Sequence, residues 1–190
     1  MNSRRSNSSV FNAGFTLLEL VITIVILSIL LTMAVPSFRD FMASRATTAQ
    51  INDLAGSIRL ARAEAIKRGF PVSICSSTDA DSDAPSCADD AEWSTGWVIF
   101  SDRNADGTID DTDTVVRVQP GYSNSGGLTA SDDTAITFNS TGILRGIAKN
   151  FQIRPKLNTS LPSYAGLSAR ICMNATGSTR LLHGEAECGG

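Results

Sequence analysis

The sequence predicts an α+β protein in which one long N-terminal helix is followed by an antiparallel β head. Three observations support this fold class. An apolar run occupies residues 15–35, apolar residues recur at helical spacing as far as residue 65, and the spacing changes to two after residue 69. The chain has 190 residues, which is enough for one domain with an appendage.

The chain begins with a polar leader, residues 1–14, which contains Arg4 and Arg5 and no acidic residue. Residues 15–35 follow and carry a single charge, Glu19. As a helix this run is ~31 Å long, enough to cross ~30 Å of hydrocarbon. Because basic residues precede the span, the N-terminus is predicted to be cytoplasmic and the rest of the chain to lie outside the cytoplasm.

Two simpler interpretations of this segment are a removable secretory signal and a plain membrane anchor. A secretory signal needs a shorter apolar stretch and an A-x-A-like site, whereas this run ends in Met33-Ala34-Val35-Pro36. Neither interpretation explains Glu19, because an unpaired carboxylate costs up to ~2.5–3.5 kcal/mol at mid-membrane. An α-amino group exposed by cleavage just upstream would supply a partner.

The helix is expected to continue over 36–69 as an amphipathic segment, with a kink or brief break at Pro36. Gly69 sits where a glycine commonly ends a helix, and Pro71 follows it. The buried stripe of this segment is predicted to be Ile51, Leu54, Ala55, Ile58, Ala61 and Ala65.

Residues 70–190 are predicted to form the head, an antiparallel sheet packed on the one helix, with no second helical pattern. Residues 120–133 and 156–167 are predicted to be loops. Short strands are expected at 71–76, 96–101, 114–119, 134–139, 151–155, 168–174 and 179–183.

All four cysteines lie in the head, and they predict two disulfides and therefore an oxidising compartment. Four cysteines permit three pairings, and pairing between neighbours in the sequence gives Cys75–Cys87 and Cys172–Cys188. A zinc site is the competing interpretation, but the spacings contain no C-x-x-C pair.

The segment GFTLLE at residues 14–19, followed by the apolar run, resembles the prepilin signature of type IV pilins and type II secretion pseudopilins. The resemblance implies cleavage between Gly14 and Phe15 by a prepilin peptidase and N-methylation of the new Phe15 terminus. It also implies that Glu19 pairs with a terminal amine during filament assembly. The implied architecture is a pilin-like lollipop, with the apolar segment as membrane anchor and later as filament core.

The end of the chain, with ARIC at 169–172 and GSTR at 177–180, resembles the GspH/FimT group of minor pilins and pseudopilins. The resemblance implies a minor pilin that assembles into or primes a type IV pilus. The alternative is the pseudopilin H subunit of the type II protein secretion system. The implied partners are other pilins or pseudopilins and the prepilin peptidase/methyltransferase. The implied location is the bacterial inner membrane, crossed once with a periplasmic head, and then the pilus or pseudopilus.

A second alternative is a minor pilin that binds DNA for uptake, because some relatives do so through arginines at a Gly-Arg-x-Arg motif in this region. Here only the second arginine position matches, at Arg180. Arg180 and Arg170 are the candidate contacts, with Arg154 and Lys156 nearby in the predicted strands. Residues 70–190 carry eight basic and fifteen acidic residues, a net charge of −7, which disfavours phosphate binding.

Residues 102–113 fit a calcium-loop pattern in which oxygen ligands alternate along the chain. Two features weaken this interpretation: Asp113 stands where a longer Glu usually binds, and the flanking segments are predicted strands rather than helices. The competing interpretation is an acidic hairpin loop whose Asp, Asn and Gly residues supply turn geometry. The candidate ligands are Asp102, Asn104, Asp106, Thr108, Asp110 and Asp113, with Gly107 at the sharp turn.

No catalytic residue and no required cofactor is predicted. The single histidine, His183, has no Asp or Cys nearby in the sequence as a partner, and no nucleophile–base pair is evident. Trp93 and Trp97 flank a Ser-Thr-Gly turn and are predicted to be core residues rather than a ligand platform. We therefore expect a protein that acts by assembly and that is itself a substrate of a peptidase and a methyltransferase.

Overall fold

The structure is a computed structural model that describes residues 15–184 and 186–189. The predicted leader, residues 1–14 with Gly14, lies outside the described residues. The chain divides into two compact units at Arg39/Asp40, and each unit is considered by itself.

Helix α1 (Leu17–Arg68) is one uninterrupted α-helix of 52 residues. It ends as predicted at Gly69, which has a φ of 74° and donates its N–H to the carbonyl of Ala65 at 3.0 Å. Of the kink or brief break predicted at Pro36, the break is wrong, because the helix continues through this residue. A proline removes one helical hydrogen bond, and an apolar run in lipid offers the neighbouring backbone groups no partners outside the helix.

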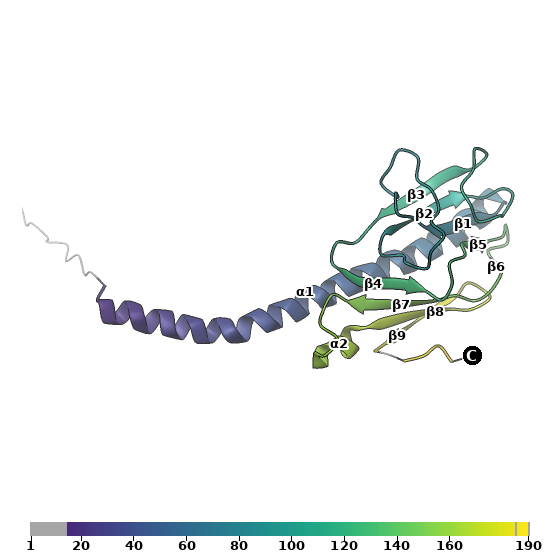
Figure 1. The fold of residues 1–190 in the computed structure, drawn as a ribbon. Coiled ribbons are helices and arrows are strands. Elements are labelled where there is room, and N and C mark those ends of the chain that lie inside the picture. Colours follow the sequence, from purple (N-terminus) through teal and green to yellow (C-terminus); the bar gives the residue numbers. More distant parts are fainter. Residues whose placement is uncertain (1–14, 185, 190) are drawn as a thin grey trace, which may run out of the picture. The chain divides into compact units, whose positions relative to one another are not determined.

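The C-terminal half of α1 lies against the sheets of the head in Figure 1. It packs there through a stripe of small and branched side chains. The predicted stripe is confirmed except at Ala55, which is half-buried. The polar residues Gln50 and Ser57 of the same half are also buried, and both form hydrogen bonds with the head. The buried apolar members are Ala43, Ile51, Leu54, Ile58, Ala61 and Ala65.

The head contains two antiparallel sheets, a five-stranded sheet of order β3-β2-β1-β5-β6 and a four-stranded sheet of order β4-β7-β8-β9. The first sheet contains β1 (Val72–Ser76), β2 (Gly96–Ser101), β3 (Thr114–Pro120), β5 (Ile136–Phe138) and β6 (Leu144–Arg145). The second contains β4 (Ser125–Ala130), β7 (Asn150–Pro155), β8 (Ala169–Met173) and β9 (Thr179–His183), which lie side by side in Figure 1.

Three elements differ from the sequence prediction. Strand β4 forms inside the predicted loop 120–133, because its glycines permit a close approach to β7: a Cβ on Gly126 would collide with the backbone of Pro155. The two-residue β6 is too short to leave a periodic signal. Helix α2 (Pro162–Leu167) forms inside the predicted loop 156–167, and its proline at the first turn was the available signal.

Two hydrophobic cores result from this arrangement. The larger lies between α1 and one face of both sheets and contains Trp93 and Trp97, which confirms that these tryptophans are core residues. The smaller lies on the opposite face of the five-stranded sheet, where Val98 and Phe100 pack with Cys75. Strands β1 and β2 are consequently buried at every position.

Candidate functional site

The N-terminal end of α1 begins with a side-chain cap. The hydroxyl oxygen of Thr16 accepts a hydrogen bond from the backbone N–H of Glu19 at 3.1 Å, and Phe15 before it is 83% exposed. Such a cap satisfies one of the N–H groups that a helix start leaves without a partner. This role of Thr16 was not predicted, although the spacing Thr16-x-x-Glu19 is a capping-box signal.

Every hydroxyl along the apolar part of α1 is bound to the helix itself. Thr23, Ser28 and Thr32 each donate to the carbonyl three residues earlier, at 2.7–2.8 Å. The Glu19 side chain, by contrast, forms no hydrogen bond or ion pair with the residues that the structure describes. Glu19 therefore supplies a carboxylate at the N-terminal end of an exposed apolar helix, where the helix dipole favours a negative charge.

By length and composition α1 can cross a membrane, and its most apolar 18-residue window is 0% buried. Its exposed side chains in this part are almost all Leu, Ile and Val. A helix segment that is apolar all round and packs against none of the residues described here needs lipid or another apolar helix around it.

Three polar contacts fasten the second half of α1 to the head. The indole N–H of Trp97 donates to the Ser57 hydroxyl at 2.9 Å in a buried site. The Tyr122 hydroxyl donates to the Asp53 carboxylate at 2.7 Å, and burial together with this bond raises the pKa of Tyr122. The Ser125 hydroxyl donates to the Gln50 carbonyl oxygen at 2.8 Å. The sequence analysis missed these contacts because their partners lie far apart in the chain.

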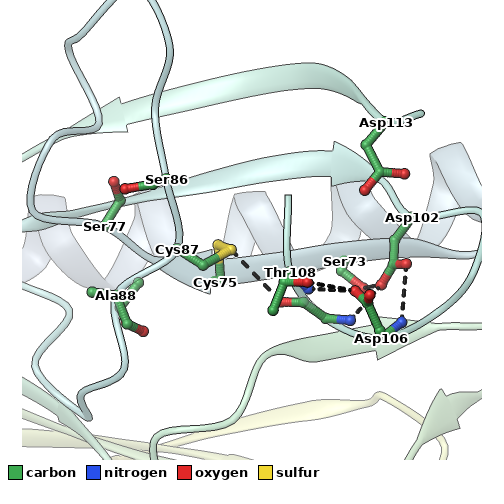
Figure 2. The surroundings of a disulfide bond; sticks show 12 residues. Ser73, Cys75, Ser77, Ser86, Cys87, Ala88, Asp102, Asp106, Thr108 and Asp113 are labelled. Atoms are coloured by element: carbon green, nitrogen blue, oxygen red, sulfur yellow. Dashed lines mark hydrogen bonds between the residues drawn. A yellow bond between two sulfur atoms is a disulfide. The ribbon is translucent and has the colours of Figure 1, made fainter. Parts of the chain in front are cut away.

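Both predicted disulfides are present, and all four cysteines are used, which excludes the zinc site. Cys75–Cys87 joins β1 to the following loop with a Cα–Cα distance of 5.5 Å (Figure 2). Cys172–Cys188 joins β8 to the C-terminal segment. The loops that they close are 12 and 16 residues long in sequence separation, for which the chain-entropy model gives ~3 kcal/mol each.

The loop 102–113 is organised around Asp102, whose side chain is 0% exposed. Its carboxylate accepts hydrogen bonds from the Ser73 hydroxyl at 2.6 Å, the N–H of Gly107 at 3.0 Å and the N–H of Asp106 at 3.2 Å (Figure 2). The Ser73 hydroxyl is also 2.7 Å from that of Thr137 on β5. Asp102 thus joins the loop to two strands of the sheet.

The other predicted calcium ligands are engaged in local turns. The hydroxyl and N–H of Thr108 donate to Asp106, and those of Thr112 donate to Asp110; these bonds lower the pKa of both carboxyls. The Asn104 amide donates to Asp106 at 2.8 Å. Burial raises the pKa of Asp113.

In the part of the chain that the structure covers, no group of three or more His, Cys, Asp or Glu residues is arranged to hold a metal ion. The loop geometry agrees with the hairpin interpretation, and calcium binding stays a prediction. Ile109 of the loop packs against the smaller core, so the loop covers this core.

The arginines considered for DNA binding lie on the four-stranded sheet. Arg170 pairs with Leu182 across β8 and β9, and Arg180 pairs with Cys172, so the two arginines are diagonal neighbours. Arg154 lies on the adjacent strand β7, and the ammonium of Lys156 donates to the Ser123 carbonyl at 2.8 Å. His183 lies at the end of β9 and is exposed.

Comparisons with known proteins agree with this architecture. Residues 50–177 match the family model described as type II transport protein GspH, and residues 11–35 match the prokaryotic N-terminal methylation motif. A search of the curated proteins found no match.

Among solved structures, the chain is similar to the type IV minor pilin FimU of Pseudomonas aeruginosa strain PAO1 in two crystal forms. The P21 form has a TM-score of 0.53 at 21% identity and covers 75% of this chain and 92% of FimU. The P65 form has a TM-score of 0.49 at 22% identity and covers 71% of this chain and 91% of FimU. The first of these matches shows that the fold is that of a minor pilin.

The GspH model spans most of the head and the second half of α1, and the methylation motif coincides with the GFTLLE segment and the apolar run. The chain therefore belongs to the GspH family of pilins and pseudopilins that carry an N-terminal methylation motif.

Proposed function

We propose that this protein is a minor subunit of a type IV pilus, which enters the filament through its N-terminal helix after residues 1–14 are removed. The observation that carries the proposal is the start of α1. There a capped and exposed apolar helix contains one carboxylate, Glu19, without a partner among the residues described. An amine at the processed Phe15 of an adjoining subunit would neutralise that carboxylate within the apolar filament core.

The proposed location follows from charge and redox chemistry. Before assembly the apolar helix crosses the bacterial inner membrane once, with the basic leader in the cytoplasm. The head lies in the periplasm, where its two disulfides persist. The proposed action is structural: the helix packs among other pilin helices and the head contacts neighbouring subunits, without a catalytic step.

Processing is tested by determining the N-terminus of the protein isolated from membranes. We expect a chain that starts at Phe15 and carries one methyl group on its α-amine. A mature chain that starts at Met1, or well beyond Val35, would contradict the proposal.

Assembly is tested with Glu19→Ala, with Thr23→Ala as the matched control in the same helix. Glu19→Ala is expected to insert into the membrane normally but to enter sheared filaments at least tenfold less, since a paired carboxylate in an apolar setting is worth about 2 kcal/mol or more. Thr23 bonds only to its own backbone, so its variant is expected to assemble as wild type does. Normal incorporation of Glu19→Ala would refute the role of the carboxylate.

The pseudopilin H subunit of type II secretion remains the alternative within the same family. The two functions differ in their partners, so mass spectrometry of proteins cross-linked to the full chain in cells discriminates them. Pilus subunits are expected, and recovery of secretion pseudopilins alone would select the alternative.

A further inference from the structure

The outer face of the four-stranded sheet is polar and carries arginines. Along β7, Phe151 and Ile153 are buried in the larger core, whereas Gln152 and Arg154 between and after them are half-buried. Because side chains alternate across a strand, these polar residues point away from the core. Arg170 on β8 alternates in the same way between buried neighbours.

Register brings these residues into one cleft. Thr129 pairs with Gln152, and Gln152 pairs with Arg170, which forms a row across three strands. The cleft over this row has a volume of about 220 Å³. Its polar lining consists of Thr129, Ser131, Asn150, Gln152, Arg154 and Arg170.

The only charged residues among this lining are the two arginines. The Arg154 guanidinium donates to the Gln152 carbonyl oxygen at 2.8 Å. Within 15–184 and 186–189, no carboxylate forms an ion pair with Arg154 or Arg170. Since a guanidinium offers five donors, most of those in the cleft are available to a ligand.

Two acidic residues near the cleft, Glu92 and Asp132, have hydrogen-bond partners among the described residues. Glu92, close to Arg154, accepts the backbone N–H groups of Ser94 at 2.9 Å and Leu128 at 3.1 Å. Asp132, next to Ser131, binds the buried ammonium of Lys149. These backbone bonds leave the negative charge of Glu92 in place, whereas Lys149 balances the charge of Asp132. The two arginines and Glu92 together give the cleft a net charge of +1.

We propose that this cleft binds the carboxylates of an aspartate-rich loop on a neighbouring pilin-type subunit. Planar guanidinium groups match carboxylates in paired hydrogen bonds, and the surrounding hydroxyls and amides add further donors. This assignment rests on the proposed function, because it requires a filament neighbour.

Charge complementarity identifies the occupant. Residues 76–113 of this chain contain eleven acidic residues and one basic residue. The loop 102–113 within this segment packs through Ile109 over the five-stranded sheet, so a subunit of this kind presents an acidic loop there. A basic face and an acidic face on one subunit suit the head-to-tail contacts that build filaments. A nucleic acid fits less well, because the cleft holds two arginines and the head has a net charge of −7.

The experiment uses the full chain in cells that assemble its filament. A photo-cross-linking amino acid replaces Thr129, and the adduct is mapped by mass spectrometry. Arg170→Glu is compared with Arg145→Glu, an identical charge reversal at the exposed residue of β6. Arg170→Gln provides a milder variant in case the reversal prevents folding, and formation of both disulfides reports folding.

We expect an adduct to an Asp- or Glu-rich segment of a pilin-type subunit. Arg170→Glu is expected to lower filament incorporation about tenfold, Arg170→Gln less, and Arg145→Glu not at all. Reversing the mapped carboxylate to arginine should restore incorporation of Arg170→Glu.

Three results would overturn the proposal: no adduct to a pilin-type subunit, a nuclease-sensitive adduct, or equal incorporation of folded Arg170 variants and wild type. If wild type itself is cleaved and incorporated in these cases, only the cleft assignment fails. If wild type is neither cleaved at Phe15 nor incorporated, the proposed function fails with it.

Discussion

Replacing Asp102 by asparagine separates a structural role for the acidic loop from a metal-binding role. The buried carboxylate accepts three hydrogen bonds, from the Ser73 hydroxyl and from the N–H groups of Asp106 and Gly107. A hydrogen bond to a charged group contributes ~1.5–3 kcal/mol, and an asparagine turns one accepting oxygen into a donor that faces other donors.

From these contacts we expect Asp102→Asn to destabilise the head by about 3 kcal/mol, since it weakens or loses two of the three bonds. For a chain of this size that loss lowers the unfolding midpoint by roughly 6–12 °C. The assay is thermal unfolding of the full chain in detergent, followed by fluorescence of the buried Trp93 and Trp97. Each sample is measured with a chelator and with millimolar calcium.

The control is Asp110→Asn, because Asp110 is exposed and bonds mainly within its own turn. Its midpoint is expected to stay close to that of wild type. The structural role is refuted if two results occur together. Asp102→Asn would have the same unfolding midpoint as wild type in chelator, and calcium would raise the midpoint of wild type but not that of Asp102→Asn. Asp102 would then act as a metal ligand.

Three further outcomes follow from the head. Ile58→Ala, at a fully buried position between α1 and the sheets, is expected to cost about 3 kcal/mol in chemical denaturation, and a loss below about 1 kcal/mol would contradict this packing. Tyr122→Phe removes the bond to Asp53 and is expected to cost about 1 kcal/mol, an effect that an Asp53→Ala background should abolish. Burial acts to raise the pKa of Asp132, but bonds from Lys149 and Thr134 outweigh it and lower the pKa from 3.8 to about 2. The stabilisation from this carboxylate is therefore present above pH ~4 and is lost as the pH falls through about 2. Asp132→Asn should consequently be less stable than wild type at about pH 6 and equally stable near pH 2. A constant difference between these two pH values would rule out that linkage.

Local signals were sufficient for the helix and for most strands. The period of apolar residues from Ile51 to Ala65 identified the buried stripe, and Gly69 marked the helix end. The disulfide pairing was also predictable, because each cysteine pairs with its neighbour in the sequence and a short loop costs the least entropy to close. The sequence predicted a kink or brief break at Pro36, and the helix continues without a break, because the bonds of the surrounding helix outweigh the single missing one.

Contacts between distant segments left no comparable signal. Strand β4 exists because Gly126 can approach the backbone of β7, which no property of the segment SGGLTA reveals by itself. The Trp97–Ser57 bond and the Tyr122–Asp53 bond join residues 40 and 69 positions apart. The same limit applies to the bond between Asp102 and Ser73, whose positions lie 29 residues apart in the chain.

The sequence by itself determined the membrane-length helix with its Glu19, the two disulfides and the α+β order, because each depends on residues close together in the chain. The tertiary structure decided what the charged residues of the head do. It buried Asp102 under the acidic loop and placed Arg154 beside Arg170 in one cleft, because strand register, and not spacing along the chain, sets which side chains meet.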